Sequence, residues 1–190
     1  MRRLPEIKLA TLLSVNEAKK LLSIKDREYS NWWWLRSPGN SQGYAASVNL
    51  DGSVHYYGDD VDYADDCVRP ALKINLESSG LTIGDTFSFG GKTFKIISDD
   101  LAFCLEDIGT HCFRTDWQAP DANVYEASDV KRFIDAWFEQ AKNKEKNDSD
   151  LDYINAALAD TEKDAYLRGW KDGYREALRD KNLEAGNATV

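Results

Sequence analysis

The pattern of apolar and polar residues in the first part of the chain predicts a short helix followed by an apolar segment. Ser14 and Glu17 have the spacing of a capping box, in which each side chain accepts a hydrogen bond from the backbone N–H of the other residue. This pattern predicts a helix from Val15 to about Leu22. A dense apolar run, Trp32–Leu35, follows and is stopped by a Ser-Pro-Gly turn signal.

Residues 44–57 alternate between apolar and polar positions, as two short strands would. Gly52 and the aspartate before it interrupt the alternation, and glycine tolerates the positive φ of a tight hairpin turn. Val48 and Val54 flank this turn and are expected to face the core. After a polar stretch, residues 68–74 return to a strand pattern.

A second unit is expected to begin near Gly80 and to contain a hairpin, a further strand and a helix. The hairpin is predicted over residues 86–97 and the strand over residues 101–105, before an irregular stretch at 106–127. Ser128 is expected to cap the helix, whose apolar residues recur at the spacing of a core-facing stripe. These apolar positions are Val130, Phe133, Ile134, Trp137, Phe138 and Ala141.

The C-terminal part of the chain is interpreted as a helical extension. Residues 1–141 are predicted to form the main domain, residues 142–150 a charged linker, and residues 151–190 the extension. Tyr166, Trp170 and Tyr174 recur every four residues and would form one narrow aromatic face on this extension. That face either packs on the main domain or mediates self-association or the docking of a partner.

Composition and charge narrow the classes of function. The chain has 190 residues and a formal net charge of −9. Phosphate contacts need clustered cations, so direct nucleic-acid binding is not expected. No stretch approaches the roughly 20 apolar residues of a membrane span. The N-terminus is too short and too polar for a signal peptide, and we therefore expect a cytoplasmic protein, with association with a virion as an open alternative.

The sequence contains no recognisable catalytic or cofactor-binding motif. It has no Gly-rich phosphate loop, no HExxH and no GxSxG. The chain has three cysteines without a CxxC spacing and only two histidines, so we expect neither a disulfide framework nor a structural zinc site. We therefore expect a non-enzymatic protein with no catalytic residues, no bound metal and no cofactor.

The most unusual segment is His55–Asp66, which holds three tyrosines and five aspartates. Tyrosine provides rigid, amphipathic contact area, as in antibody loops. Aspartate oxygens suit basic or hydroxyl-rich ligands and can also bind calcium, but the spacing does not fit an EF-hand loop. A solvated acidic loop is the simpler interpretation, and a weak calcium site remains open.

The same region is also unusual in what it lacks. Residues 43–69 contain no Lys, Glu, Gln, Met or Trp. Codons that end in C or T cannot encode these five amino acids, whereas they can encode every residue from His55 to Cys67.

Three separated blocks of this chain resemble the pattern WWLRSPG…A..V...G.V…VRPAL of bacterial and bacteriophage DUF6273 domains. The blocks are Trp32–Gly39, Tyr44–Val54 and Val68–Leu72, preceded by a lead-in helix at Leu12–Ala18. The resemblance covers residues 9–76. The segment Gly84–Phe94 and the helix Tyr125–Phe138 are similar to the hairpin and helix that normally open such domains. In this chain they come second, over residues 80–141, so the order resembles a circular permutation or two partial copies.

The resemblance implies an α+β, C-type-lectin-like fold with short antiparallel strands. The family is also similar to the variable proteins of diversity-generating retroelements. These retroelements rewrite adenines of Asn codons to give Tyr, Asp, His, Ser, Gly, Ala or Cys. Trp32–Trp34 and Arg69 would then be scaffold, and the residues between them would form a displayed surface for a protein or glycan partner. The predicted binding residues are Tyr44, Asn49, His55, Tyr56, Tyr57, Asp59, Asp60, Asp62, Tyr63, Asp65 and Asp66.

Two other functions compete with this ligand-binding module. An acidic phage or mobile-element protein could inhibit a host factor such as a nucleic-acid-binding defence enzyme. A formylglycine-generating type of enzyme shares the lectin-like fold but needs a reactive cysteine pair or a metal site. The tryptophan run either packs in the core, with each indole N–H bonded to a carbonyl, or provides a platform for stacking sugars.

Overall fold

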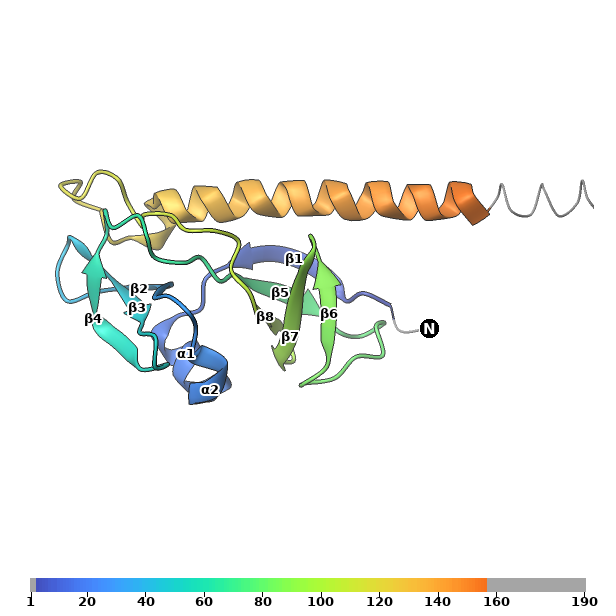
Figure 1. The fold of residues 1–190 in the computed structure, drawn as a ribbon, viewed down its shortest axis with the longest axis horizontal. Helices are drawn as coiled ribbons and strands as arrows, with labels where there is room; N and C mark the ends of the chain where they lie inside the picture. The colour runs from blue at the N-terminus through green and yellow to red at the C-terminus, as the bar shows by residue number, and fades with distance from the viewer. Residues whose placement is uncertain (1–2, 157–190) are drawn as a thin grey trace, which may run out of the picture. The chain divides into compact units, whose positions relative to one another are not determined.

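The computed structural model describes residues 3–156 of the chain (Figure 1). Residues Met1–Lys144 and Glu145–Val190 form two separate compact units. In the second unit the described residues, 145–156, are helical. The predicted aromatic face at Tyr166, Trp170 and Tyr174 lies outside the described residues.

The first unit is an α+β fold of two antiparallel sheets, which confirms the predicted class of fold (Figure 1). A five-stranded sheet has the order β1-β5-β8-β7-β6, and a three-stranded sheet has the order β2-β3-β4. The five-stranded sheet consists of β1 (Glu6–Thr11), β5 (Ala71–Asn75), β6 (Thr86–Phe89), β7 (Lys92–Ser98) and β8 (Leu101–Cys104). The smaller sheet consists of β2 (Trp33–Pro38), β3 (Tyr44–Val48) and β4 (Val54–Asp60). The short helices are α1 (Val15–Leu21), α2 (Ile24–Arg27) and the 3-10 turn η1 (Tyr125–Ala127).

The local signals for α1 and for the β3–β4 hairpin are confirmed. The hydroxyl of Ser14 accepts a hydrogen bond from the Glu17 backbone N–H at 3.2 Å, and the Glu17 carboxylate accepts the Ser14 N–H at 2.7 Å. Val48 pairs with Val54 across the hairpin, and Gly52 has a φ of 76° in its turn. Val48 is fully buried, whereas Val54 is only half-buried. Strand β1 and helix α2 have no counterpart among the predicted elements.

Two hydrophobic cores lie on the two faces of the five-stranded sheet, because its side chains alternate between them. On β8, for example, Ala102 and Cys104 belong to one core, and Leu101 and Phe103 to the other. The second core also takes in α1 and Trp33 of β2. The sheet therefore joins the two halves of the first unit, because β1 and β5 precede residue 76 and β6–β8 follow it.

The helix that begins at residue 129 covers the first core. The Ser128 hydroxyl accepts a hydrogen bond from the Lys131 backbone N–H, so Ser128 caps this helix as predicted. Phe138 packs against Phe89 of β6, with ring centroids 5.8 Å apart. Val130, Ile134, Phe138 and Ala141 are buried, and Phe133 and Trp137 are partly buried against the same core.

The predicted charged linker lies in a helical part of the chain. Residues 142–150 are helical throughout, and the boundary between the two compact units, after Lys144, lies inside this stretch. Charged residues such as lysine and glutamate are good helix formers, so high charge alone does not end a helix.

Candidate functional site

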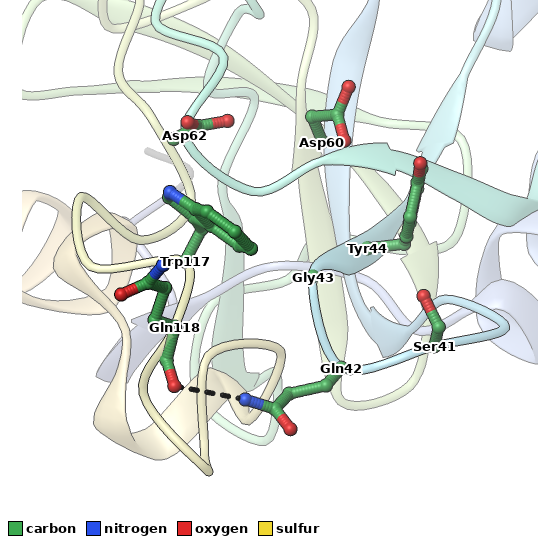
Figure 2. A pocket seen from close by; sticks show the side chains of 8 residues that line it. All are labelled: Ser41, Gln42, Gly43, Tyr44, Asp60, Asp62, Trp117 and Gln118. Atoms are coloured by element: carbon green, nitrogen blue, oxygen red, sulfur yellow. Dashed lines mark hydrogen bonds between the residues drawn. The ribbon is translucent and has the colours of Figure 1, made fainter.

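Seven of the eleven predicted binding residues line two cavities of the first unit. A cavity of about 760 Å³ lies between the β2–β3 loop, the residues at the end of β4, and residues 117–118 (Figure 2). Its lining residues are Ser41, Gln42, Gly43, Tyr44, Asp60, Asp62, Trp117 and Gln118.

Hydrogen bonds hold the β2–β3 loop against the segment that carries Trp117. The Gln42 side-chain amide donates to the carbonyl oxygens of Gln118 and Ala119, at 3.2 and 2.6 Å. The Asn123 amide donates to the Ser41 carbonyl at 2.8 Å. These bonds join parts of the chain more than 70 residues apart, so this wall of the cavity forms only when the first unit is folded.

One aromatic and one acidic side chain lie on each side of this cavity. Trp117 and Tyr44 stand across the opening from each other, with Asp62 on the side of Trp117 and Asp60 on the side of Tyr44 (Figure 2). Trp117 is 53% exposed and Tyr44 is 37% exposed. Exposed aromatic faces provide contact area, and carboxylate and amide groups provide directional hydrogen bonds, which together suit a polar organic ligand.

A second cavity, of about 450 Å³, lies where the start of β2 meets the segment after β4. Its lining residues are Asn31, Trp32, Asp59, Tyr63, Asp65 and Asp66. Hydrogen bonds to backbone carbonyls hold the two segments together. The Cys67 N–H donates to the Trp32 carbonyl at 2.8 Å, and the Asn31 side-chain amide donates to the Asp65 carbonyl at 2.7 Å.

Asp66 is the buried acid of the second cavity. Asp66 is only 2% exposed, and its Oδ2 has no hydrogen-bond partner. Burial, with smaller contributions from the negative charges of Asp59 and Asp65, raises the pKa of Asp66 to about 7. A strongly shifted pKa in a cavity is a physical mark of a functional group.

Four predicted binding residues lie outside both sets of lining residues. Tyr56 and Tyr57 on β4 are each about half exposed, and their ring centroids are 4.2 Å apart. His55 packs edge-on against Trp32, with ring centroids 6.1 Å apart. Asn49 lies in the β3–β4 turn, where its amide donates to the Ser53 hydroxyl at 2.8 Å.

The tryptophan run is mostly scaffold. Trp33 and Trp34 are fully buried, and their indole N–H groups donate to the carbonyl oxygens of Arg27 and His111, at 3.0 and 2.8 Å. The packing interpretation is therefore confirmed for these two residues. Trp32 is half-buried and lines the second cavity.

Arg69 is a buried cation that packs among aromatic side chains of the second core. Its guanidinium carbon lies 4.4 to 5.1 Å from the ring centroids of Tyr29, Phe103 and Trp33, and its Nη2 donates to the Cys104 carbonyl. Burial lowers the pKa of Arg69 from its ordinary value. Aromatic faces stabilise a cation that is removed from water, so this residue is structural rather than displayed.

Some lining residues were not predicted from the sequence. Trp117 and Gln42 belong to polar loops without periodicity. Trp32 belongs to the apolar run that was interpreted as scaffold, and Asn31 directly precedes it. A lone tryptophan in a polar stretch is the signal that could have indicated Trp117. No comparable signal marks Gln42 or Asn31.

The residues that the structure describes show no arrangement for a metal ion. Among them, no three His, Cys, Asp or Glu side chains converge closely enough to hold one. The five aspartates of His55–Asp66 are instead distributed over the two cavities. Within the same range of residues, no helix is both long and apolar enough to cross a membrane.

Comparison with known proteins finds one family that is similar to part of this chain. Residues 5–76, which span β1 to β5, match the family DUF6273, a domain of unknown function. This match supports the family assignment that the sequence motifs indicated. Nothing among the curated proteins matches the chain, and neither does any solved structure.

Proposed function

We propose that this protein is a non-enzymatic binding module that presents its Tyr/Asp-rich surface to a protein or glycan partner. The observation that carries the proposal is the first cavity, where Tyr44 and Trp117 face each other beside Asp60 and Asp62. Exposed aromatic side chains dominate binding energy at interfaces, and the carboxylates select polar or cationic groups of the ligand.

We also propose a C-type-lectin-like fold, in which the two halves of the domain follow each other in permuted order. What supports a single domain is the five-stranded sheet, in which β1 and β5 from the matched residues pair with strands that lie beyond residue 76. A bacterial or bacteriophage origin and a cytoplasmic or virion-associated location belong to the same proposal.

Diversification by a retroelement would explain the composition of residues 55–67. Most side chains of this segment are exposed, whereas residues 45–48 before it and residues 67–72 after it are buried. Substitutions in such a segment would change the displayed surface and leave the core intact. Sequencing the locus in related isolates tests this. Substitutions concentrated opposite the adenines of a nearby template repeat are expected, and a fixed segment without a repeat would count against diversification.

Ligand binding at the first cavity is tested with two probes, a glycan array and a displayed library of random peptides. The full chain is compared with a double variant, Tyr44→Ala and Trp117→Ala. Truncation of a central aromatic at an interface costs about 2 kcal/mol or more, so selected ligands should bind the double variant more than about tenfold less tightly. Tyr153→Ala is the matched control, because Tyr153 is 79% exposed and lies in the second unit.

Melting curves establish that each variant folds before its binding is compared. If neither probe yields a ligand that distinguishes the wild type from the double variant, the first cavity is not the binding site and the proposal is wrong. A further variant, Tyr56→Ala with Tyr57→Ala, shows whether the tyrosine pair of β4 belongs to the same binding surface.

A second candidate function is inhibition of a basic host factor. It is favoured by the gathering of five aspartates around the two cavities. Charge complementarity of this kind is screened by salt, so binding to such a factor should weaken steeply as ionic strength rises. Binding that is insensitive to salt would instead favour aromatic recognition of a neutral ligand.

A further inference from the structure

The second cavity is lined by acidic residues, one of which has a buried oxygen without a hydrogen-bond partner in the protein. Three of its six lining residues are aspartates, and none of the six carries a positive charge. Asp66 lines this cavity and is 2% exposed. No group of the protein donates a hydrogen bond to its Oδ2. A buried carboxylate without a partner is costly, and a bound cation would offset this cost.

Two aromatic rings border the same acids. Trp32 is held half-buried by the contact of its ring with His55, and Tyr63 is 52% exposed. Aromatic faces attract cations, and they do so most strongly where the cation is partly removed from water. The walls of the cavity and its acids therefore favour the same class of ligand.

The arrangement suits an organic cation better than a metal ion. Within residues 3–156, no group of three acidic, histidine or cysteine side chains is close enough to surround a metal. A space of about 450 Å³ is instead in the range of pockets for organic groups. Among biological cations, guanidinium is planar, stacks on aromatic rings and donates in pairs to carboxylates, whereas ammonium is compact and strongly hydrated.

We propose that the second cavity binds the guanidinium group of an arginine side chain from a protein partner, with Asp66 as its main acceptor and Trp32 and Tyr63 stacking against it. This inference rests on the proposed function, because it names the group that the displayed surface takes from a partner. Asp59 and Asp65 contribute the negative field that draws the cation in.

The test uses the full, isotope-labelled chain and N-acetyl-arginine methylamide as the probe. The matched compound N-acetyl-citrulline methylamide has nearly the same shape but no charge. The arginine compound should shift the NMR resonances of the Trp32 indole N–H and of residues 63–67 in a saturable way. For one side chain, a dissociation constant of about 1 mM is expected. The citrulline compound should leave these resonances in place.

Two variants distinguish a specific acceptor from a general loss of charge. Asp66→Asn should weaken binding of the arginine compound about tenfold or more, because the main charged acceptor is lost. Asp99→Asn is the control, because it removes the same charge from an exposed position that lines neither cavity. It should change the affinity by less than about twofold. Tyr63→Ser, at an exposed position, should weaken binding about threefold through loss of stacking.

Several outcomes would overturn the inference. Equal shifts with the arginine and citrulline compounds would show that charge is not recognised. Unchanged affinity in Asp66→Asn would remove the proposed acceptor. Calcium chloride that shifts the same resonances saturably, where the arginine compound does not, would identify a metal site instead.

The two proposals can fail separately. If library peptides bind through Tyr44 and Trp117 but the arginine compound does not bind, only the present inference is wrong. If the arginine compound binds as expected and no array or library ligand depends on Tyr44 and Trp117, only the proposed function of the first cavity is wrong.

Discussion

Replacing Asp66 by Asn should stabilise the protein at neutral pH, although it removes a group that we place in a binding cavity. The pKa of Asp66 in the folded protein is raised from 3.8 to about 7, mainly by burial. Between these two values the folded state holds a proton that the unfolded state lacks. The free energy of unfolding therefore falls as pH rises from about 4 to about 7, and is constant above that.

The size of this effect follows from the shift in pKa. About three pH units at about 1.4 kcal/mol each give an upper limit of about 4 kcal/mol. Water that enters through the cavity screens part of the charge, so we expect about 2 to 4 kcal/mol. Asparagine stays neutral at every pH. The difference in stability between the variant and the wild type should be smallest near pH 4.5 and should grow to this amount at pH 8.

Urea denaturation followed by tryptophan fluorescence, at intervals from pH 4.5 to pH 8, measures the difference between the two proteins. Asp62→Asn, at an exposed position, is the control and should keep the pH dependence of the wild type. If the curves for the wild type and Asp66→Asn run parallel over this range, Asp66 is ionised in the folded protein without cost. In that case the argument from burial is wrong.

Two further predictions concern the scaffold around the cavities. Burial alone would raise the pKa of Glu17, but hydrogen bonds with Arg36 and with the cap of α1 lower this pKa to about 2. The ionised Glu17 therefore stabilises the fold above pH 4.5, and this stabilisation is lost as pH falls toward 2. Glu17→Gln should therefore cost about 2 kcal/mol at pH 7 and little near pH 2 in urea denaturation, and an equal loss at both values would contradict this. Gly90 has a φ of 60°, and a Cβ there would lie 2.6 Å from the Cβ of Ala141 in the helix that covers the first core. Gly90→Ala should lower the melting temperature more than Gly80→Ala, which shares the positive φ but has open space around it, and equal effects would show that no clash occurs.

The elements of the first unit that sequence reasoning identified correctly are those set by short-range chemistry. The capping box of Ser14 and Glu17, the positive φ of Gly52 and the cap at Ser128 each depend on residues within a few positions of one another. The apolar stripe from Val130 to Ala141 is similarly a local property of the helix. The motifs of residues 32–72 also indicated the family that matches residues 5–76. The charged linker predicted at residues 142–150 is helical, because charge does not by itself oppose a helix.

Sequence alone determined that a Tyr/Asp-rich segment lies between buried strands, since the composition of the segment and the apolar pattern on either side are properties of the sequence. Tertiary structure alone decided how that segment is used. It places Tyr44 and Asp62 with Trp117 in one cavity and Asp66 with Trp32 in another. It also buries Asp66, whose type and neighbours in the sequence predict an exposed residue. The physical reason is that a cavity and a shifted pKa depend on which distant segments exclude water from a side chain. Here the start of β2 contacts the segment through the hydrogen bond from Asn31 to Asp65, and residues 117–118 line the first cavity with Asp60 and Asp62.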